Sequence, residues 1–429
     1  MLSSIEALRY RSLRDVRQAV APFQILVGAN ASGKSTFLDV PHLLRDLLRL
    51  GVTEAVRSRS PDVRNLVWME EREHFEVAVE LDGSERVRYE VAVGHDARGE
   101  LAVLAENLWL KPRNAVEPVE AVGDFPSPDA PRDSLLHEAK DAPGWRLIVS
   151  KEAETGKDFF FSETSDRHSP FRFGPRKLAL ANLPEDEEQF PSASWAKRVL
   201  LDGVQRLALS GEAIRRSAPP GNRKGFQADG SSLPWAVEAL RSSDPERFES
   251  WLAHVRTALP DLRSVETVER PEDRHRYLRI SYETGHKAPS WTVSDGTLRL
   301  LALTLVAYLD PPGTIYLIEE PENGIHPQAV ECVFQALSSV YECQVLCASH
   351  SPVILSMAEP EQLLCFARTA DGATDVVRGD RHPMLERKNR EADSEEREKE
   401  RRDERGYRRH PDTAEVFAGW DRVAAWPDD

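Results

Sequence analysis

Two short stretches of this 429-residue chain carry residues whose types and spacing suit chemistry on a phosphate group. The first is GANASGKST at 28–36, which fits the pattern G-x-x-x-x-G-K-[ST], follows the apolar run Gln24–Val27 and precedes a stretch typical of a helix. Glycines allow backbone amides to curl around phosphate oxygens, and the N-terminus of a helix adds the positive end of its dipole. The pattern therefore predicts a phosphate-binding loop. Its expected nucleotide contacts come from Gly28, Asn30, Gly33, Lys34, Ser35 and Thr36.

The second stretch, TIYLIEEPENGIHP at 314–327, joins a run of apolar residues to two adjacent carboxylates, Glu319 and Glu320. An unbroken apolar run suits a strand that is covered on both faces, and open parallel sheets bind their ligands at the carboxyl ends of the strands. Beside the glycine-rich loop, this is the layout of a Walker B strand. We expect Lys34 to reach the β and γ phosphates of ATP, while Ser35 and Glu319 hold Mg²⁺. Glu320 would then orient or deprotonate the attacking water.

Four further residues follow or precede apolar elements. His350 stands in ASHSP, directly after the apolar run QVLCA, so it is expected at the same sheet edge, where its imidazole could hydrogen-bond the γ-phosphate. Ser294 and Gly296 precede an apolar helix that begins near Leu298. They could offer amides and a hydroxyl to an anion, although an ordinary helix cap explains them as well. His326 fits either a turn residue or a dimer contact.

The bulk composition limits the classes of partner. The formal net charge of −16 would repel a nucleic-acid backbone, so any DNA contact needs a local basic patch. The longest apolar run, Leu300–Leu309, is about half the ~20 residues that span a bilayer, so no membrane segment is predicted. The four cysteines lack paired metal-ligand spacing, which favours reduced core thiols in a cytoplasmic protein. They are Cys332, Cys343, Cys347 and Cys365.

The elements that must position these residues predict an α/β fold with a split nucleotide-binding core at 1–50 and 290–385. A strand pair and the helix Ser35–Arg49 open the core, and strands around the helix Pro327–Tyr341 complete it. The strands of the core are expected at Ile5–Tyr10, Phe23–Val27, Ile315–Ile318 and Gln344–Ala348.

An insertion at 51–289 separates the two halves of the core. Alternating residues predict antiparallel strands within 65–180, a helical lid follows at 190–260, and a strand pair is expected within 262–284. The segment 386–429 is a charged tail, which fits a solvated helix or a disordered segment better than a binding arm. The insertion's strands are expected at His74–Leu81, Arg86–Val93, Leu101–Leu110 and Trp145–Val149, a loop at Pro112–Pro143, and its helices at Ser194–Arg216 and Leu233–Leu259.

The ordered set LRYRSLRDV, GANASGKST, VSDGTLRL, LIEEPENGIHP and ASHSP resembles the ABC-type ATPases of the SMC, RecF and OLD lineage. It is most similar to the stand-alone bacterial AAA family ATPases whose Walker B segment reads EEPENG-HP. The resemblance covers Leu2 to about Leu50 and Ser290 to about Ala367. It implies ATP and Mg²⁺ as cofactors and a homodimer that encloses two ATP molecules, with higher assembly left open. Ser294 and Gly296 would then act on the nucleotide of the opposite subunit.

The chain also departs from the pattern of this group. Most members have aspartate where this chain has Glu319. They also have a Q-loop, whose glutamine couples the γ-phosphate to the lid, and no such glutamine can be assigned in the insertion of this chain. Long heptads are absent, which argues against a rod-like SMC protein. Too few residues follow His350 for a Toprim nuclease domain, so no nuclease is expected in this chain. Arg11, in the RYRSL segment, fits a place beside the nucleotide or an ordinary surface position.

The resemblance favours an ATP-hydrolysing dimeric switch, slow in turnover, that controls a separate effector such as a nuclease or toxin in bacterial antiphage defence. The alternative is a RecF-like DNA-repair ATPase that binds DNA directly. Its basic residues would include Arg215 and Arg216 with Arg223 and Lys224, although each pair also fits a solvated surface. A scaffold that binds ATP without hydrolysis is a third class, against which Glu320 argues.

Overall fold

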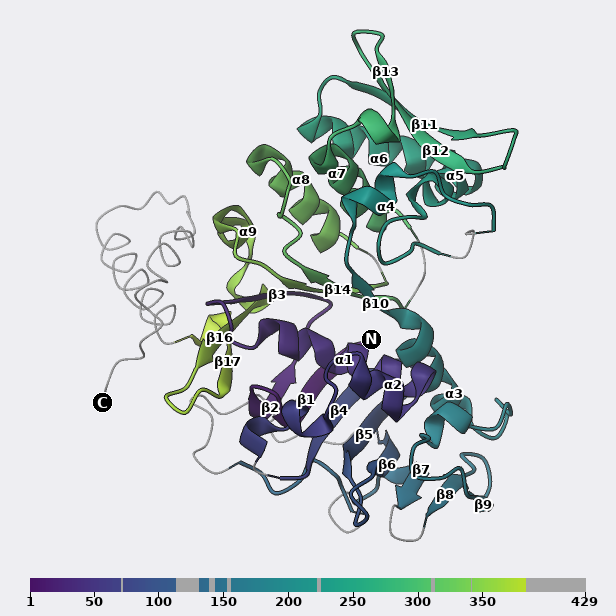
Figure 1. The fold of residues 1–429 in the computed structure, drawn as a ribbon, viewed down its shortest axis with the longest axis vertical. Helices are drawn as coiled ribbons and strands as arrows, with labels where there is room; N and C mark the ends of the chain where they lie inside the picture. Colours follow the sequence, from purple (N-terminus) through teal and green to yellow (C-terminus); the bar gives the residue numbers. More distant parts are fainter. Residues whose placement is uncertain are drawn as a thin grey trace, which may run out of the picture.

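The computed structural model describes residues 1–70, 72–112, 131–138, 143–152, 156–221, 225–309, 313–340 and 342–382. Two large sheets and a small one organise the described chain (Figure 1). The charged tail at 386–429, most of the loop expected at Pro112–Pro143, and the basic pair Arg223 and Lys224 lie outside the described residues. No helix of the described part is long and apolar enough to cross a membrane.

The larger sheet is antiparallel and has the strand order β2-β1-β4-β5-β6-β7-β8-β9. Its apolar residues alternate with polar ones, as the sequence predicts for strands within 65–180. Its strands are β1 (Leu2–Tyr10), β2 (Leu13–Ala19), β4 (His74–Asp82), β5 (Arg86–His95), β6 (Leu101–Lys111), β7 (Arg146–Glu152), β8 (Lys157–Phe161) and β9 (His168–Phe171).

The six-stranded sheet has the order β10-β14-β15-β3-β16-β17, and only β17 at its edge is antiparallel to its neighbour. Because β14, β15 and β3 are parallel neighbours, the motifs that follow them meet at one edge of the sheet. Its strands are β3 (Phe23–Gly28), β10 (Val204–Leu207), β14 (Ile315–Glu319), β15 (Gln344–Ala348), β16 (Leu363–Arg368) and β17 (Thr374–Arg378).

Helix α1 (Lys34–Leu50) lies between the two sheets (Figure 1), and its apolar residues share one core with both. Side chains of the six-stranded sheet alternate between its two faces: Leu26 joins this core, whereas Ile25 and Val27 join a second core with the helices on the other face. Burial on both faces explains the unbroken apolar runs in the sequence.

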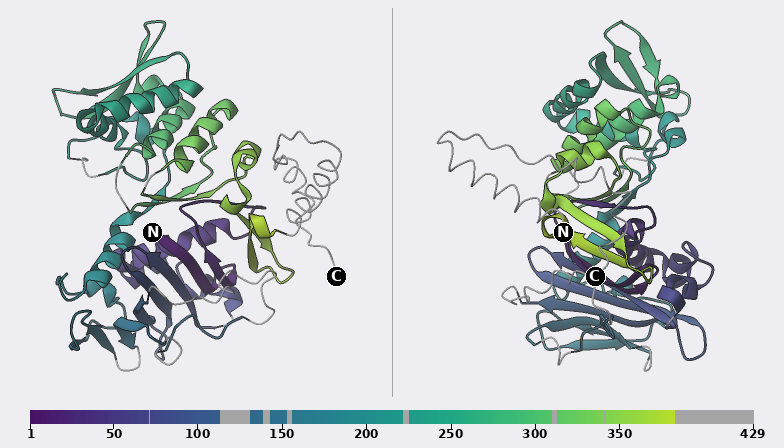
Figure 2. Two further views of the ribbon diagram at one scale, coloured as in Figure 1. Left: turned by 180° about the vertical axis from the view of Figure 1, so that it is seen from behind. Right: turned by 90° about the vertical axis from the view of Figure 1, so that its left-hand side faces the viewer.

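The second core is covered by helices α5 to α8 and by the small sheet β11-β12-β13, which lie at the opposite end of the molecule from β6–β9 (Figures 1 and 2). The elements are α5 (Leu233–Ser243), α6 (Pro245–Ala258), β11 (Leu262–Glu269), β12 (Arg276–Tyr282), β13 (Lys287–Pro289), α7 (Asp295–Val306) and α8 (Pro327–Ser338). Shorter helices are α2 (Val52–Arg57), α3 (Pro191–Arg198), α4 (Gly211–Arg215) and α9 (Pro352–Met357).

Three expectations about these elements are wrong. The helix expected at Ser194–Arg216 ends at Arg198 and is followed by a π-helical turn. The next residues, Val204–Leu207, form the strand β10 because they pair in parallel with β14. Strand β1 belongs to the antiparallel sheet and not to the nucleotide-binding sheet. The helix expected at Leu233–Leu259 is two helices, since Asp244 caps α6 by accepting a hydrogen bond from the backbone amide of Arg247 and Pro245 occupies its first position.

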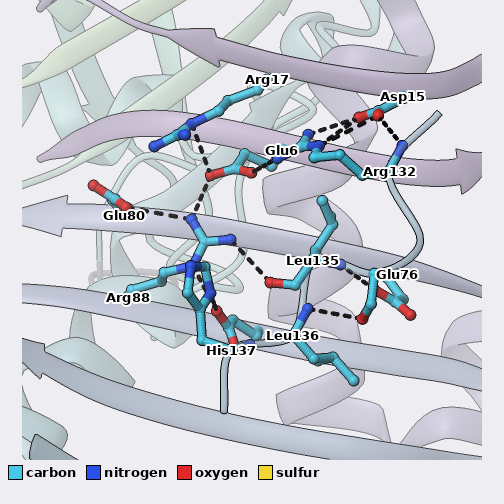
Figure 3. A network of polar contacts seen from close by, with 12 residues as sticks. Glu6, Asp15, Arg17, Glu76, Glu80, Arg88, Arg132, Leu135, Leu136 and His137 are labelled. Atoms are coloured by element: carbon cyan, nitrogen blue, oxygen red, sulfur yellow. Dashed lines mark hydrogen bonds and ion pairs between the residues drawn. The ribbon is translucent and has the colours of Figure 1, made fainter. Parts of the chain in front are cut away.

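The outer face of the eight-stranded sheet is a buried polar network (Figure 3). Glu6, Glu80 and Glu90 surround the guanidinium of Arg88, whose side chain is 1 % exposed. The segment 131–138 covers this face: Leu135 accepts a hydrogen bond from Arg88 through its carbonyl oxygen and donates one to Glu76 through its amide. Burial alone would raise the pKa of Glu6, but the guanidinium of Arg88, together with those of Arg17 and Arg132, outweighs burial and lowers this pKa to about 2.

Other predictions about the fold agree with these elements. The α/β class, the predicted strands of the insertion and the strand pair β11–β12 are present. The four cysteines are buried and form no disulfide. The division into a core at 1–50 and 290–385 and an insertion at 51–289 stays a prediction, although β10 adds a strand from within the expected insertion to the six-stranded sheet.

Candidate active site

The glycine-rich loop connects β3 to α1, and two of its glycines have backbone conformations that other residues avoid. Gly28 has a φ of 150° and Gly33 a φ of 104°. A Cβ atom on Gly28 would lie 2.2 Å from the carbonyl oxygen of Phe366, and one on Gly33 would lie 2.0 Å from Oγ1 of Thr374. Residues of strands β16 and β17 therefore lie in close contact with the loop, and only glycine fits at these two positions.

Lys34 begins helix α1 and lies inside the loop. Its Nζ donates hydrogen bonds of 2.8 Å to the carbonyl oxygens of Gly28 and Ala29, and the residue is only 7 % exposed. Burial lowers the pKa of the Lys34 ammonium to about 8, while Glu320 and Glu319 oppose that shift. The ammonium is thus held in the loop, with both carboxylates close enough to act on it.

Glu319 ends strand β14, and both of its carboxylate oxygens contact groups of the same chain. The Ser35 hydroxyl donates to Oε2, and Nη2 of Arg206 on β10 donates to Oε1 at 2.6 Å. Glu320 follows with a φ of 49°, an uncommon conformation for a residue with a side chain. Its amide donates to the carbonyl oxygen of Ala348 at 2.8 Å, which ties this turn to the end of β15.

His350 comes after β15, whose residue Ala348 is paired with Glu319. Glu322 holds the His350 segment, because one of its carboxylate oxygens accepts from the Ser349 hydroxyl at 2.7 Å and from the His350 amide at 3.0 Å. Burial, followed by the charge of Lys34, lowers the pKa of the His350 imidazole below its usual value. The neutral imidazole is therefore favoured at neutral pH.

These elements enclose a cleft of about 350 Å³ at the end of the six-stranded sheet. The structure brings most of the predicted site residues together there. The cleft is lined by Arg11, Ser12, Asn30, Ala31, Ser32, Gly33, Lys34, Ser35, Thr36, Glu319, Glu320, Ala348 and His350. Gly28 lies at the base of the loop, where its carbonyl oxygen accepts from Lys34.

Ser294 and Gly296 do not line this cleft. The Ser294 hydroxyl caps α7 by accepting a hydrogen bond from the Thr297 amide at 3.2 Å, which is the ordinary capping role. Gly296 packs closely against the chain after β14, since a Cβ on it would lie 2.8 Å from the carbonyl oxygen of Gly324. Asp295, between them, pairs with Arg215 at 2.8 Å.

The sequence left the roles of His326 and Arg11 open, and the structure shows the contacts that each of them makes. His326 caps α8, since its ring nitrogen accepts a hydrogen bond from the Gln328 amide at 3.3 Å. Arg11 lines the cleft, and its guanidinium lies 3.6 Å from Asp39 and over the ring of Tyr10. The capping hydrogen bond agrees with a place for His326 in the turn before α8.

Sequence patterns do not predict the two contacts made by Arg206 and Glu322. Arg206 stands in a segment with helical periodicity, and its strand is defined only by pairing with β14. Glu322 lies close to the acidic pair in EEPENG, but nothing in the spacing shows that it holds the segment after β15.

The residues present suit a magnesium ion bound together with nucleotide phosphates. In the described residues no cluster of three or more His, Cys, Asp or Glu side chains could hold a metal by itself. The site instead offers one carboxylate, from Glu319, and one hydroxyl, from Ser35, and the two touch each other. Mg²⁺ is commonly held by one or two carboxylates, with phosphates and water completing its shell.

Comparison with known proteins gives both a family and a fold. A family described as "AAA domain, putative AbiEii toxin, Type IV TA system" matches residues 23–356. No curated protein matches. A crystal structure of an Smc head bound to the C-winged helix domain of ScpA superposes with a TM-score of 0.51 and 14% identity, covering 88% of this chain and 96% of that chain.

Two further Smc head structures resemble the chain more weakly. One, with an extended coiled coil and bound to the C-terminal domain of ScpA, derives from Pyrococcus furiosus: its TM-score is 0.49 at 14% identity, over 88% of this chain and 95% of that one. The other, from Thermotoga maritima, has a TM-score of 0.42 at 10% identity, over 88% and 98%.

The family match spans most of the chain, and the superposition with the Smc head at a TM-score of 0.51 shows the same fold. Both agree with a glycine-rich loop, a Walker B strand and a following histidine at one sheet edge. The chain therefore belongs to this AAA-domain family of P-loop ATPases, and it shares the fold of an Smc head.

Proposed function

We propose that this ATPase is a cytoplasmic dimeric switch that binds and slowly hydrolyses ATP and controls a separate effector protein, a nuclease or toxin, in bacterial antiphage defence. The observation that carries the ATPase part is the cleft in which Lys34, Glu320 and His350 meet. The effector part is supported by the family's description, which names an AbiEii toxin and a toxin–antitoxin system.

The chemistry follows from the groups around the cleft. The loop amides and Lys34 would bind the β and γ phosphates, for which the lysine must exchange its two loop carbonyls for phosphate oxygens. Mg²⁺ bound at Ser35 and Glu319 would offset the negative charge of those phosphates. Glu320 would accept the proton of the attacking water, and the neutral His350 imidazole would donate a hydrogen bond to the γ-phosphate.

The dimer is part of the proposal because the residues that the resemblance assigns to the nucleotide of the opposite subunit are missing from the cleft of their own subunit. Ser294 and Gly296 do not line the cleft of the chain that carries them. We place them opposite the nucleotide of a second copy, so that two ATP molecules hold two subunits together and hydrolysis releases them. The insertion would report this change to the effector.

ATP turnover tests the enzyme part directly. We expect Glu320→Gln and Lys34→Ala each to lower the rate at least tenfold, because a general base or a phosphate contact is lost. Glu331→Gln is a matched control, since Glu331 is an exposed carboxylate of helix α8 outside the cleft. Equal rates in wild type, Glu320→Gln and Lys34→Ala would refute the ATPase assignment.

Light scattering tests the dimer. Glu320→Gln should bind ATP without hydrolysing it, so it should form a dimer that dissociates when ATP is removed. Ser294→Arg, which places a bulky cation at the expected interface, should stay monomeric while its own cleft still binds ATP. An ATP-bound Glu320→Gln that remains a monomer would contradict the shared site.

Two of the basic residues on which the DNA-repair alternative depends are already paired with acids. Arg215 contacts Asp295 at 2.8 Å, and Arg216, directly after α4, forms an ion pair with Glu212 of that helix. Their positive charge is therefore partly neutralised within the chain, which leaves the DNA-binding alternative without structural support from this pair.

A further inference from the structure

Glu319 is charge-compensated by an arginine from a neighbouring strand. Arg206 lies opposite Leu317 in the parallel pairing of β10 with β14, and Glu319 follows Leu317 by two residues. Residues two apart on a strand lie on the same face, so the guanidinium and the carboxylate meet beside the Ser35 hydroxyl. The contact measures 2.6 Å, with 46 % of the Arg206 side chain and 29 % of the Glu319 side chain exposed.

Both oxygens of the carboxylate that is expected to bind a metal already accept a hydrogen bond. Ser35 donates to one oxygen of Glu319 and Arg206 to the other. A divalent cation at this carboxylate would stand close to the guanidinium, and two like charges around one carboxylate repel each other. The cation and the arginine therefore compete for Glu319.

A second cleft gives the arginine room to move. It has a volume of about 390 Å³, and Glu319 and Glu320 line both this cleft and the first one. Arg206 itself lines this second cleft, together with Arg299 and the mostly apolar residues that follow β10.

We infer that Arg206 is a built-in counter-ion that occupies the metal position on Glu319 in the nucleotide-free protein and must withdraw into the second cleft when a divalent cation binds. The inference rests on the proposed function, because it takes Glu319 as the metal position. Arg206 thereby lowers the affinity for the cation and makes its binding depend on the phosphates that the nucleotide supplies. It is a positioning residue and not a catalytic one.

Binding of Mn²⁺ at saturating ADP tests this competition. The ternary complex of protein, ADP and Mn²⁺ is detected by its enhancement of water-proton relaxation. Because the ion pair is partly exposed, solvent screens it, and we expect about a fivefold tighter affinity for Mn²⁺ in Arg206→Gln. Arg206→Ala, which also removes the charge, should behave alike, and Arg206→Lys should stay near wild type. Arg198→Gln is the matched control, because it breaks the exposed 3.0 Å pair with Glu187 away from the site.

Each outcome decides the point. Tighter Mn²⁺ binding in Arg206→Gln or Arg206→Ala, with Arg198→Gln unchanged, supports competition at Glu319. If the wild type binds Mn²⁺ as tightly as both neutral variants, the inference is wrong, while the proposed ATPase function still stands. If no variant forms the ternary complex, both the inference and the assignment of Glu319 as the metal position in the proposed function are wrong. Circular dichroism establishes that each variant is folded.

Discussion

Removing Arg88 should destabilise the fold more than any exposed ion pair does. Three buried carboxylates, those of Glu6, Glu80 and Glu90, face its guanidinium, and Nε contacts Glu90 at 2.6 Å. Arg88→Met has a similar length and leaves these carboxylates without their shared cation. Breaking a buried ion pair on one side costs about 3–5 kcal/mol, so we expect a loss of this order in the free energy of unfolding.

Urea denaturation followed by circular dichroism measures this loss at pH 7. Arg176→Met is the matched control, because Arg176 pairs with Glu100 at 2.5 Å and both side chains are more than half exposed. Such a pair contributes at most about 1 kcal/mol. At pH 4 the deficit of Arg88→Met should shrink, because the carboxylates left without their cation become protonated. Equal unfolding free energies for Arg88→Met and Arg176→Met would refute the reasoning.

Three further predictions concern the loop, the pH dependence and the histidine segment. Gly33→Ala should weaken binding of a fluorescent ATP analogue more than tenfold, because its Cβ would overlap Thr374; wild-type affinity would contradict this. The pKa of Glu6 is lowered to about 2, so its contribution to stability is present above its unfolded pKa near 4.5 and is lost as pH falls towards 2. Urea midpoints should fall across this window, and a flat profile would count against the ion pair. Glu322→Ala should release the His350 segment and lower ATP turnover about tenfold with little change in nucleotide affinity, whereas equal losses in both would point to general unfolding.

The candidate site could be predicted from the sequence because its parts are local. A glycine-rich loop needs glycine where φ is positive, and Gly28 and Gly33 have such conformations. Two apolar runs followed by polar residues place Glu319 and His350 at one edge once the strands are parallel neighbours. Each of these signals depends on a few adjacent residues and on one general rule of sheet geometry.

Other features depend on pairing between distant segments, which periodicity does not record. The four residues of β10 follow helix α3 and precede α4, and only hydrogen bonds to β14 make them a strand. The polar faces of β4 and β5 would suit solvent as well as burial. They are buried because the segment 131–138 lies over them, and that segment falls within a stretch that the sequence marks only as a loop.

The unusual glutamate of the Walker B strand depends both on a local sequence signal and on pairing between distant segments. The sequence shows that Glu319 is one methylene longer than the residue usual at this position, without giving a reason. In the structure its carboxylate lies between Ser35, which follows the loop, and Arg206, which comes from the strand that the sequence does not reveal. An aspartate at this place would end one carbon earlier, so the side chain of Ser35 or Arg206 would have to shift to keep its contact. The longer side chain thus fits the competition that we propose between Arg206 and a divalent cation, in which the carboxylate stays neutralised until nucleotide arrives.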